Sequence, residues 1–506
     1  MKRNSKNSVG NKSSLSGPEN FWPVKIIGDV TICVYPNIHQ MSSYVLLEQE
    51  DWFEDEMEFV RAYILPDMNA LDIGANHGVY ALSIANKLKT GHVWAFEPTS
   101  APGRMLARSI KLNNFCEKVT WVHAGLSDRQ GSAVIRTSIN SELSSLHGNT
   151  GDKETIRIET LDNYLQANAI NVTIEFVKLD AEGEEINVLR GGHQFFVHQS
   201  PLIMFELEYG TKKNHGLIEA IMALGYKIYR LLPDMAMLIE YESSFEDCYM
   251  LNLFACKPEN ASKLAARGLL ARKEDIDLYS SENLAIDLDW EKRLESFPFT
   301  RTCKNHWSSH INVVPKQYLA ALSICLQVHG PSLTSAERAF LLQTAANLID
   351  SMLQNSAGVQ DVHPSVWLLK LNLLHVQGYR SAAVTLASHL VTAFEKGIVP
   401  SWPFIPPARQ FFSRKPVTSI EQWLITVLQE FIEYRHEFSS YYVTDALGAL
   451  QSLLTNPNRS LNIDRRLVLC AKRTGKKIEI ATSHPLLNQN FSPNYTIWRE
   501  ICGAPN

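Results

Sequence analysis

The pattern of apolar and polar positions divides the chain into two halves. From about residue 21 to 271, short apolar runs alternate with amphipathic stretches. Strands that are buried on both faces give nearly continuous apolar runs, as in a parallel sheet covered by helices. This alternation predicts an α/β fold with right-handed crossovers and a doubly wound, mostly parallel sheet. The clearest runs predict strands at 69–75, 91–98, 119–128, 174–180 and 201–208, with helices such as 80–87 and 102–113 between them.

Two segments depart from this alternation. Strands near 226–232 and 249–257 are joined without room for a full crossover helix, so we expect them to form an antiparallel pair. The stretch 129–172 holds two β-like pieces around a Ser-rich loop. A long insertion beside a parallel sheet either contacts substrate or is a hairpin with no such role. In this insertion Ser145 and His147 are candidates for substrate contact, although a solvated loop explains them more simply.

From about residue 302 the pattern becomes helical. Thr334-x-x-Glu337 is a capping box that predicts the start of a helix, and two further helices are expected on either side of Gly378. The sequence therefore predicts an α/β domain followed by an all-α C-terminal domain. The expected division is a disordered polar tail at 1–20, an α/β domain at 21–273, a linker at 274–301 and an α-helical domain at 302–506.

Composition argues against several classes of protein. The chain has 506 residues, 48 Lys and Arg against 53 Asp and Glu, and a net charge of −5, which argues against the basic footprint of a nucleic-acid-binding protein. It holds no apolar run near the roughly 20 residues that a membrane span needs. The eight cysteines form no Cys-x-x-Cys pair, so we expect reduced thiols and no zinc site. Together with a polar first segment that lacks an apolar signal core, these features predict a cytoplasmic protein.

The strongest local signal is the loop of sequence DIGANHG that follows the first predicted strand. In a doubly wound sheet, ligands bind at this strand-to-helix turn. Gly74 permits the tight turn, and Gly78 permits close approach of helix and strand. A dinucleotide-binding loop needs a second bare glycine for its pyrophosphate, but Asn76 stands there and the last glycine comes one residue early. Asp72 suits a cationic ligand better, and S-adenosylmethionine has an ammonium group and no phosphate.

The next strand ends in a second candidate. Glu97 lies at the tip of the second strand, where a carboxylate can accept both hydroxyls of a ribose. This feature fits NAD and S-adenosylmethionine equally well. Ala124 and Gly125, near the end of the third strand, are placed to flank an adenine ring.

Together these motifs resemble those of FkbM-type methyltransferases. The similarity rests on DIGANHG, on FEP at Phe96–Pro98, on VKLDAEG with Glu185, on LSD, on IETLDNYL and on PLIMFELE, over roughly residues 45–260. It implies a class I methyltransferase fold with a Rossmann-like sheet, S-adenosylmethionine as the methyl donor and a hydroxyl oxygen as the usual acceptor. Sugars and polyketide-type natural products are acceptors in the family.

The resemblance also implies roles for single residues. Asp72, Gly74, Asn76 and Gly78 would line the methionine moiety together with Ala75 of the same loop, and Glu97 would bind the ribose. Asp180 and Glu182 fall in the Asp-x-Glu-Gly motif of the family.

Methyl transfer to an alcohol needs a group that takes up the hydroxyl proton. Asp180 and Glu182 follow the fourth strand and face the same crevice as the cofactor loop, so we predict one of them as the base or orienting group. Capping of the following helix by Asp180 is the alternative. Glu206 is predicted to bind the substrate hydroxyl. Asp180, Glu206 and Glu208 could together bind Mg²⁺, but their spacing does not favour a metal.

Several questions stay open at this stage. The acidic segment 51–58 precedes the first strand, and Glu56 or Glu58 is a candidate for covering the cofactor. The helical half is a candidate for recruiting a substrate, a partner enzyme or a second copy of the chain. An NAD-dependent oxidoreductase and a non-catalytic interaction protein are the competing functions.

Overall fold

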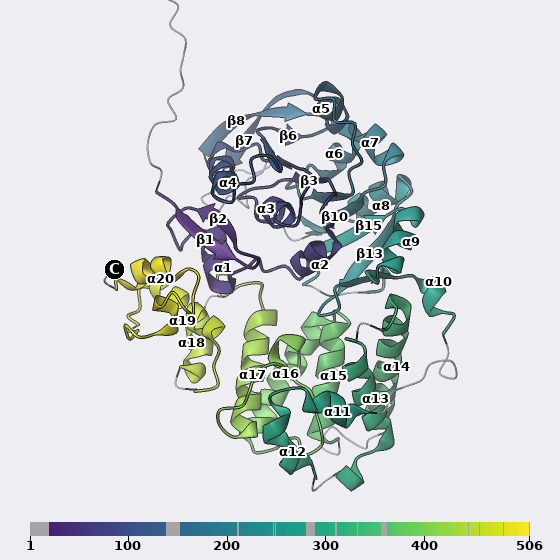
Figure 1. The fold of residues 1–506 in the computed structure, drawn as a ribbon, viewed down its shortest axis with the longest axis vertical. Helices are drawn as coiled ribbons and strands as arrows, with labels where there is room; N and C mark the ends of the chain where they lie inside the picture. Colours follow the sequence, from purple (N-terminus) through teal and green to yellow (C-terminus); the bar gives the residue numbers. More distant parts are fainter. Residues whose placement is uncertain are drawn as a thin grey trace, which may run out of the picture.

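Figure 1 shows the computed structural model of the chain, in which an α/β domain lies above a layer of helices. The predictions for the tail, for Ser145 and for His147 lie outside the residues that the structure describes. These residues are 20–137, 152–209, 212–245, 247, 249–279, 289–308, 311–330, 332–355, 362–443, 445–454, 456–478 and 480–504.

A nine-stranded sheet forms the centre of the α/β domain. Its order is β16-β14-β13-β15-β10-β9-β3-β4-β5, and the five strands from β10 to β5 run parallel. β15 lies antiparallel between β10 and β13. Numbered along the chain, the seven central strands stand in the order 3-2-1-4-5-7-6, which is the sheet of class I methyltransferases. The bounds are β3 Ala70–Ile73, β4 Val93–Phe96, β5 Val119–Val122, β9 Phe176–Leu179, β10 Leu202–Glu206, β13 Lys227–Leu232, β14 Met237–Glu240, β15 Asn252–Cys256 and β16 Leu270–Ala271.

The five predicted parallel strands and the antiparallel pair are confirmed, with one correction. The apolar run expected as a strand at 119–128 divides, since β6 (Gly125–Leu126) leaves the main sheet and pairs with β8. β6, β8 (Asp152–Glu159) and β7 (Gly131–Thr137) form a separate three-stranded sheet. The insertion therefore begins earlier than its sequence pattern indicates.

Helices cover both faces of the main sheet (Figure 1). Along β3, Ala70 packs into the core on one face, whereas Leu71 and Ile73 pack into the core on the other. This division follows from the alternation of side chains along a strand. The first face is covered by α2 (Glu56–Tyr63), α3 (Val79–Ala85), α4 (Ser100–Leu112) and α9 (Pro258–Ala266), and the second by α5 (Leu161–Ala167), α6 (Glu185–Gly191), α7 (His193–His198) and α8 (His215–Ala223).

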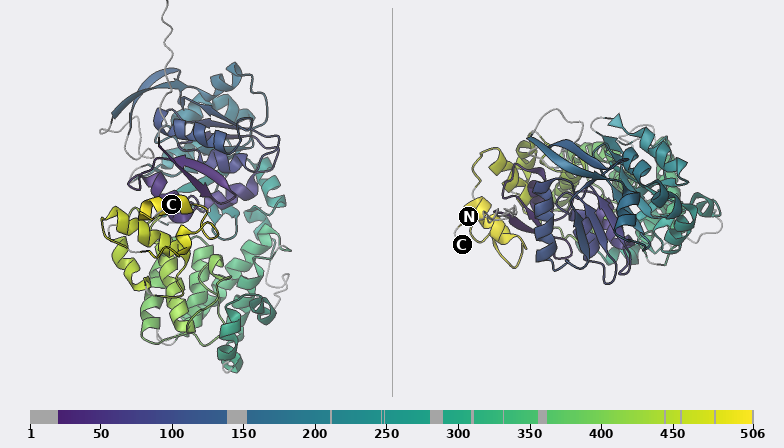
Figure 2. Two further views of the ribbon diagram at one scale, coloured as in Figure 1. Left: turned by 60° about the vertical axis from the view of Figure 1, so that its left-hand side comes forward. Right: turned by 90° about the horizontal axis from the view of Figure 1, so that it is seen from above.

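The N-terminal hairpin packs against the last helices of the chain. β1 (Trp22–Ile26), β2 (Val30–Val34) and α1 (Met41–Gln49) share a core with α19 (Leu461–Arg473) and α20 (Tyr495–Cys502). Figure 2 shows the same neighbourhood from two further sides. The side chain of Asn494 bonds both backbone groups of Lys25, at 2.7 and 3.0 Å. The guanidinium of Arg466 lies 3.7 Å from the carboxylate of Glu48, and both side chains are buried.

The lower layer consists of antiparallel helices that pack in chain order. The predicted capping box is confirmed at the start of α14: Thr334 Oγ1 accepts from the Glu337 N–H at 3.2 Å, and the Glu337 carboxylate accepts from the Thr334 N–H at 2.7 Å. Leu232, Met237 and Ala271 of the upper domain join the core of this layer. Its main helices are α13 Lys316–Gln327, α14 Ser335–Gln354, α15 Pro364–Val376, α16 Arg380–Glu395 and α17 Ile420–Arg435.

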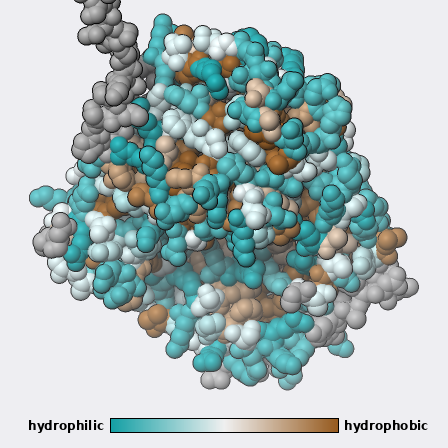
Figure 3. Space-filling model, turned by 45° about the horizontal axis from the view of Figure 1, so that its top comes forward, coloured by the Kyte–Doolittle hydropathy of each residue, from teal (hydrophilic) through white to brown (hydrophobic). Residues whose placement is uncertain are grey.

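Two further observations concern a possible membrane span and the polarity of the surface. No helix within the described ranges combines the length and the apolarity that a bilayer crossing requires. The face in Figure 3 is mostly hydrophilic, with its hydrophobic residues in small groups.

Candidate functional site

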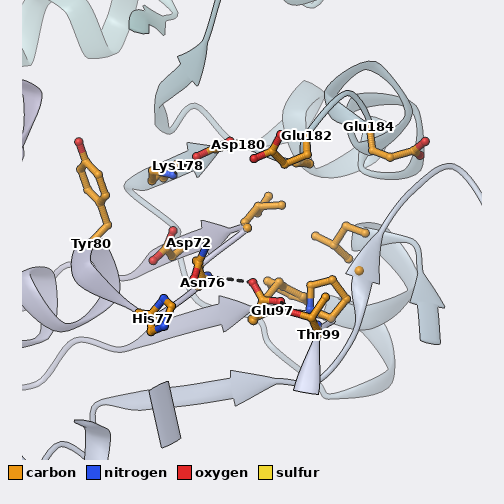
Figure 4. Close-up of a pocket in the computed structure, with 18 of the residues that line it drawn as sticks. Asp72, Asn76, His77, Tyr80, Glu97, Thr99, Lys178, Asp180, Glu182 and Glu184 are labelled. Carbon is orange, nitrogen blue, oxygen red and sulfur yellow. Dashed lines mark hydrogen bonds and ion pairs between the residues drawn. The ribbon is translucent and has the colours of Figure 1, made fainter. Parts of the chain in front are cut away.

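A cavity lies at the carboxyl ends of β3, β4 and β9, where the sequence places its ligand (Figure 4). The structure brings most of the predicted site residues together there. Gly78, Ala124 and Glu206 do not line it. Those that do are Asp72, Gly74, Ala75, Asn76, Glu97, Gly125, Asp180 and Glu182.

The loop after β3 packs closely against the ends of β4 and β9. Gly74 has φ +82°, and a Cβ at this position would lie 1.7 Å from the carbonyl oxygen of Asp180, so only glycine fits. The N–H groups of Gly74 and Ala75 donate to the carbonyl oxygen of Phe96 at 3.0 and 2.9 Å. Gly78 serves packing instead, since a Cβ there would lie 2.3 Å from Leu106 Cδ1.

Asp72 is buried beneath this loop with one oxygen satisfied. Its Oδ2 accepts from the Ala81 N–H at 2.9 Å, and its Oδ1 has no hydrogen-bond partner among the described residues. Burial raises the pKa of Asp72 to about 6, although the nearby Lys178 ammonium opposes the shift. An unsatisfied buried acceptor of this kind fits a ligand that brings a cationic donor.

Glu97 holds the loops after β3 and β4 together. Its Oε2 accepts from the Asn76 N–H at 2.9 Å, and its Oε1 accepts from the N–H of Thr99 at 2.7 Å and from its hydroxyl. Burial raises the pKa of Glu97 to about 7. Three of the roughly four lone-pair sites of the carboxylate are thereby used, and Oε2 can still accept one hydroxyl.

A charged cluster occupies the third side of the cavity. Lys178 Nζ lies 2.6 Å from Asp180 Oδ2 and 5.1 Å from the centre of the Tyr80 ring. The Tyr80 hydroxyl donates to Glu54. Burial alone would lower the pKa of Lys178, but the surrounding carboxylates, with Asp180 foremost, outweigh it and raise that pKa. The cluster therefore contains a single cation held by several acids.

The turn after β9 aims Asp180 at the cavity. Glu182 and Gly183 have φ +51° and +97°, and the Glu185 carboxylate accepts from the N–H groups of Ala181 and Gly183 at 2.9 and 3.0 Å. α6 begins at Glu185, so the alternative role for Asp180 as its cap is wrong. The Asp180 side chain instead pairs with Lys178.

Glu206 lies behind this cluster at the end of β10. Burial, with the neighbouring charges of Asp180 and Glu182, raises the pKa of Glu206 to about 10. At neutral pH the carboxyl therefore keeps its proton and can donate a hydrogen bond. Within the described residues, no group of three His, Cys, Asp or Glu side chains is arranged to hold a metal ion.

The comparison with protein families agrees with this geometry. The family model described as the methyltransferase FkbM domain matches residues 72–228, which include every cavity residue that the sequence analysis selected. Residues 72–228 form a methyltransferase FkbM domain. The family and the fold are those of S-adenosylmethionine-dependent methyltransferases.

Solved structures similar to the FkbM domain are distant in sequence. The methyltransferase FkbM from Methylobacillus flagellatus KT is 17% identical, covers 39% of this chain and 47% of that chain, and has a TM-score of 0.27. The chain thus spans about half the length of that relative. A precorrin-6y C5,15-methyltransferase from Geobacter metallireducens GS-15 is 10% identical (40% and 88% covered, TM-score 0.25). A SAM-dependent methyltransferase from Aquifex aeolicus is 10% identical (44% and 98% covered, TM-score 0.25). No curated protein matches the chain.

The cavity also has lining residues that the sequence analysis missed. Glu54 lines the cavity, whereas Glu56 and Glu58 of the same acidic segment do not. Lys178 stands inside the VKLDAEG motif and was not singled out. The insertion also contributes, because Ile135, Ile156 and Ile158 of β7 and β8 form an apolar wall. Gly125 lies against that wall, near Ile156 and Pro98.

Proposed function

We propose that the chain is an S-adenosylmethionine-dependent O-methyltransferase that methylates a hydroxyl group of a sugar, a glycan or a natural product. The observation that carries this proposal is the position of Asp72, Glu97 and Asp180 around one cavity of an FkbM domain. Carboxylates outnumber cations there, and the methyl donor is a cation with an ammonium and a sulfonium group. The charge of the cavity therefore matches that of the cofactor.

The residues of the cavity fit S-adenosylmethionine moiety by moiety. Asp72 Oδ1 lacks a donor, and the ammonium group of the methionine part would supply one. Glu97 would accept a ribose hydroxyl through Oε2. The apolar wall beside Gly125 would cover the adenine. The cofactor supplies an activated methyl group, so the protein has to hold the acceptor oxygen in line with it, at about 3–3.5 Å.

We assign to Asp180 the role of taking up the proton of the acceptor hydroxyl. An alcohol must lose its proton as the new carbon–oxygen bond forms, and a carboxylate in hydrogen-bond reach can take it up. The ion pair with Lys178 fixes the Asp180 carboxylate at the cavity wall. Glu182 lies two residues further along the same turn and is the alternative base. Glu206 does not line the cavity, so we assign it no contact with the acceptor.

The partners follow from the same proposal. The acceptor is a hydroxyl-bearing small molecule or glycan and not a nucleic acid, and the site of action is the cytoplasm. The metal-free mechanism remains a proposal, with Mg²⁺ as the alternative. Loss of turnover in EDTA that Mg²⁺ restores would contradict it.

Isothermal titration with S-adenosylhomocysteine, the expected product, tests the cofactor site. We expect one-to-one binding that weakens at least tenfold, or about 1.4 kcal/mol, in Asp72→Ala and in Glu97→Ala. Glu159→Ala is the control, since Glu159 lies outside the cavity. Unchanged affinity in both cavity variants would contradict the site. Binding of NADH in place of S-adenosylhomocysteine would favour an oxidoreductase.

A further inference from the structure

A second cavity adjoins the cofactor cavity at the junction of the two halves. Glu54 lines both cavities, and the residues that follow it line the second one. The floor comes from β13 and from the segment that leads into β15. The roof comes from the helical half, at the start of α16 and the end of α17.

The second cavity brings arginines together with four carboxyl groups, those of Glu54, Asp55, Glu56 and Asp247. Arg230 comes from β13, and His375, Arg380 and Arg435 come from the helical half. Arg435 forms an ion pair with Asp55 at 2.5 Å, and His375 Nε2 lies 3.1 Å from Asp234 Oδ2.

Arg230 and Arg380 donate to backbone carbonyl oxygens. Arg230 donates to that of Gln377 at 2.7 Å, and Arg380 donates to those of Arg435, Glu437 and Tyr434 at 2.7, 3.3 and 3.5 Å, with the charges of Asp55 and Asp247 nearby. In the part of the chain that the structure describes, neither forms an ion pair with Asp or Glu. Burial lowers the pKa of both guanidinium groups to about 10.

Aromatic rings hold both guanidinium groups in place. Arg230 stacks on Phe245, with 3.9 Å between the guanidinium carbon and the ring centre. Arg380 lies 4.8 Å from the ring of Tyr249 and 4.6 Å from that of Phe438. Desolvated, oriented guanidinium groups are suited to planar or tetrahedral oxyanions, because their forked donors match phosphate and carboxylate. Asn252 Nδ2, on the same cavity, is a further buried donor without a hydrogen-bond partner.

We propose that this interdomain cavity is the acceptor subsite and that Arg230 and Arg380 bind an oxyanion of the acceptor, a phosphate or a carboxylate. The hydroxyl to be methylated then lies beyond Glu54, at Asp180. The inference rests on the proposed function, and it gives the helical half a direct part in substrate recognition.

Titration of the full-length protein, with and without S-adenosylhomocysteine, tests the subsite. The probes are inorganic phosphate, glucose 6-phosphate, glucuronate and glucose. We expect at least one anionic probe to bind, at least tenfold more tightly than glucose, and to weaken at least tenfold in Arg380→Gln and Arg230→Gln. Preference for glucose 6-phosphate or for glucuronate identifies the anion. Affinity for S-adenosylhomocysteine should stay within about threefold of wild type in both variants.

Arg267→Gln is the matched control. Arg267 also stacks on an aromatic ring, Tyr63, and donates to a backbone carbonyl, but it lines neither of the two cavities. It should leave binding of every probe unchanged.

A measurement on the wild-type protein avoids any folding defect of the variants. Phenylglyoxal should modify Arg230 and Arg380, and the anionic probe should protect them, as mapped by peptide mass spectrometry. Absence of anion binding, or binding that neither variant weakens and that protects neither arginine, overturns the proposal. Failure of S-adenosylhomocysteine to bind would instead overturn the proposed function, because anion binding is measured without it as well.

Discussion

The two cavities that meet at Glu54 differ in charge. The cofactor cavity is lined by six carboxylates, Glu54, Asp72, Glu97, Asp180, Glu182 and Glu184, and by one lysine. The interdomain cavity holds three arginines and a histidine, most of them from the helical half, beside the carboxyl groups of Glu54, Asp55, Glu56 and Asp247. A cationic cofactor suits the first and an anionic group suits the second. The helical half therefore supplies most of the cationic side chains that can bind a negatively charged group beside the reacting centre.

The largest effect is expected from a methyl group added to the cofactor loop. Gly74→Ala combines a positive φ with a Cβ 1.7 Å from the Asp180 carbonyl oxygen, so it should cost about 3–5 kcal/mol of unfolding free energy. Gly397→Ala in the helical half has nearly the same φ, +83°, but nothing within 4 Å, and should cost only about 1–2 kcal/mol. Urea denaturation compares the two. Equal costs would mean that the close approach of the loops does not matter to stability.

The next effect concerns turnover. Asp180→Asn keeps the shape of the side chain but removes the base, so methyl transfer should fall by about 100-fold or more. Affinity for S-adenosylhomocysteine should change by less than about threefold, because the assigned role lies in the chemical step. Transfer of a labelled methyl group to an acceptor measures the rate. A larger loss in Glu182→Gln than in Asp180→Asn would move the role of base to Glu182.

A smaller effect is expected where the ribose binds. Glu97→Gln should weaken S-adenosylhomocysteine binding about tenfold, because the amide accepts through one oxygen only. It should leave anion binding in the interdomain cavity unchanged, since Glu97 does not line that cavity. Calorimetry of both ligands on one sample checks this. Loss of both together would show that the two cavities are not separate sites.

The smallest expected effect is a dependence on pH. The pKa of Glu97 is raised to about 7 by burial, so its carboxylate becomes available to the ribose as pH rises. Affinity for S-adenosylhomocysteine should rise about threefold to fivefold from pH 6 to 8, and only about twofold in Glu97→Gln, where Asp72 with its pKa of about 6 still titrates. In the unliganded protein, stability has the opposite dependence on pH. The raised pKa of Glu97 stabilises the folded state below about pH 4.5, and this contribution is lost as pH rises through 7.

The sequence was informative wherever one local pattern determines one local structure. The apolar runs of β3, β4, β9 and β10 and the capping box of α14 depend on neighbouring residues, and their prediction is confirmed. The loop glycines can be identified because a tight turn favours Gly74 and the close approach of helix and strand favours Gly78; both have positive φ in the structure. The same holds for Asp180 and Glu97, which follow directly on the ends of strands.

Side chains brought together from distant segments could not be found in this way. Glu54 was one acid among five in its segment, and only the fold separates it from Glu56 and Glu58. Lys178 looks like one residue of a buried strand until Asp72, Asp180 and Glu54 surround it. Arg230 and Arg380 are 150 positions apart, and no spacing rule connects them.

The packing of α19 and α20 on the N-terminal hairpin bears on how the chain is made. Tyr44 and Trp22 share their core with Trp498, and the Tyr44 hydroxyl lies 3.2 Å from Cys470 Sγ. More than 400 residues must therefore be synthesised before these early segments can close their core. We expect translation intermediates that end before α19 to expose that apolar face and to depend on chaperones until the last helices emerge.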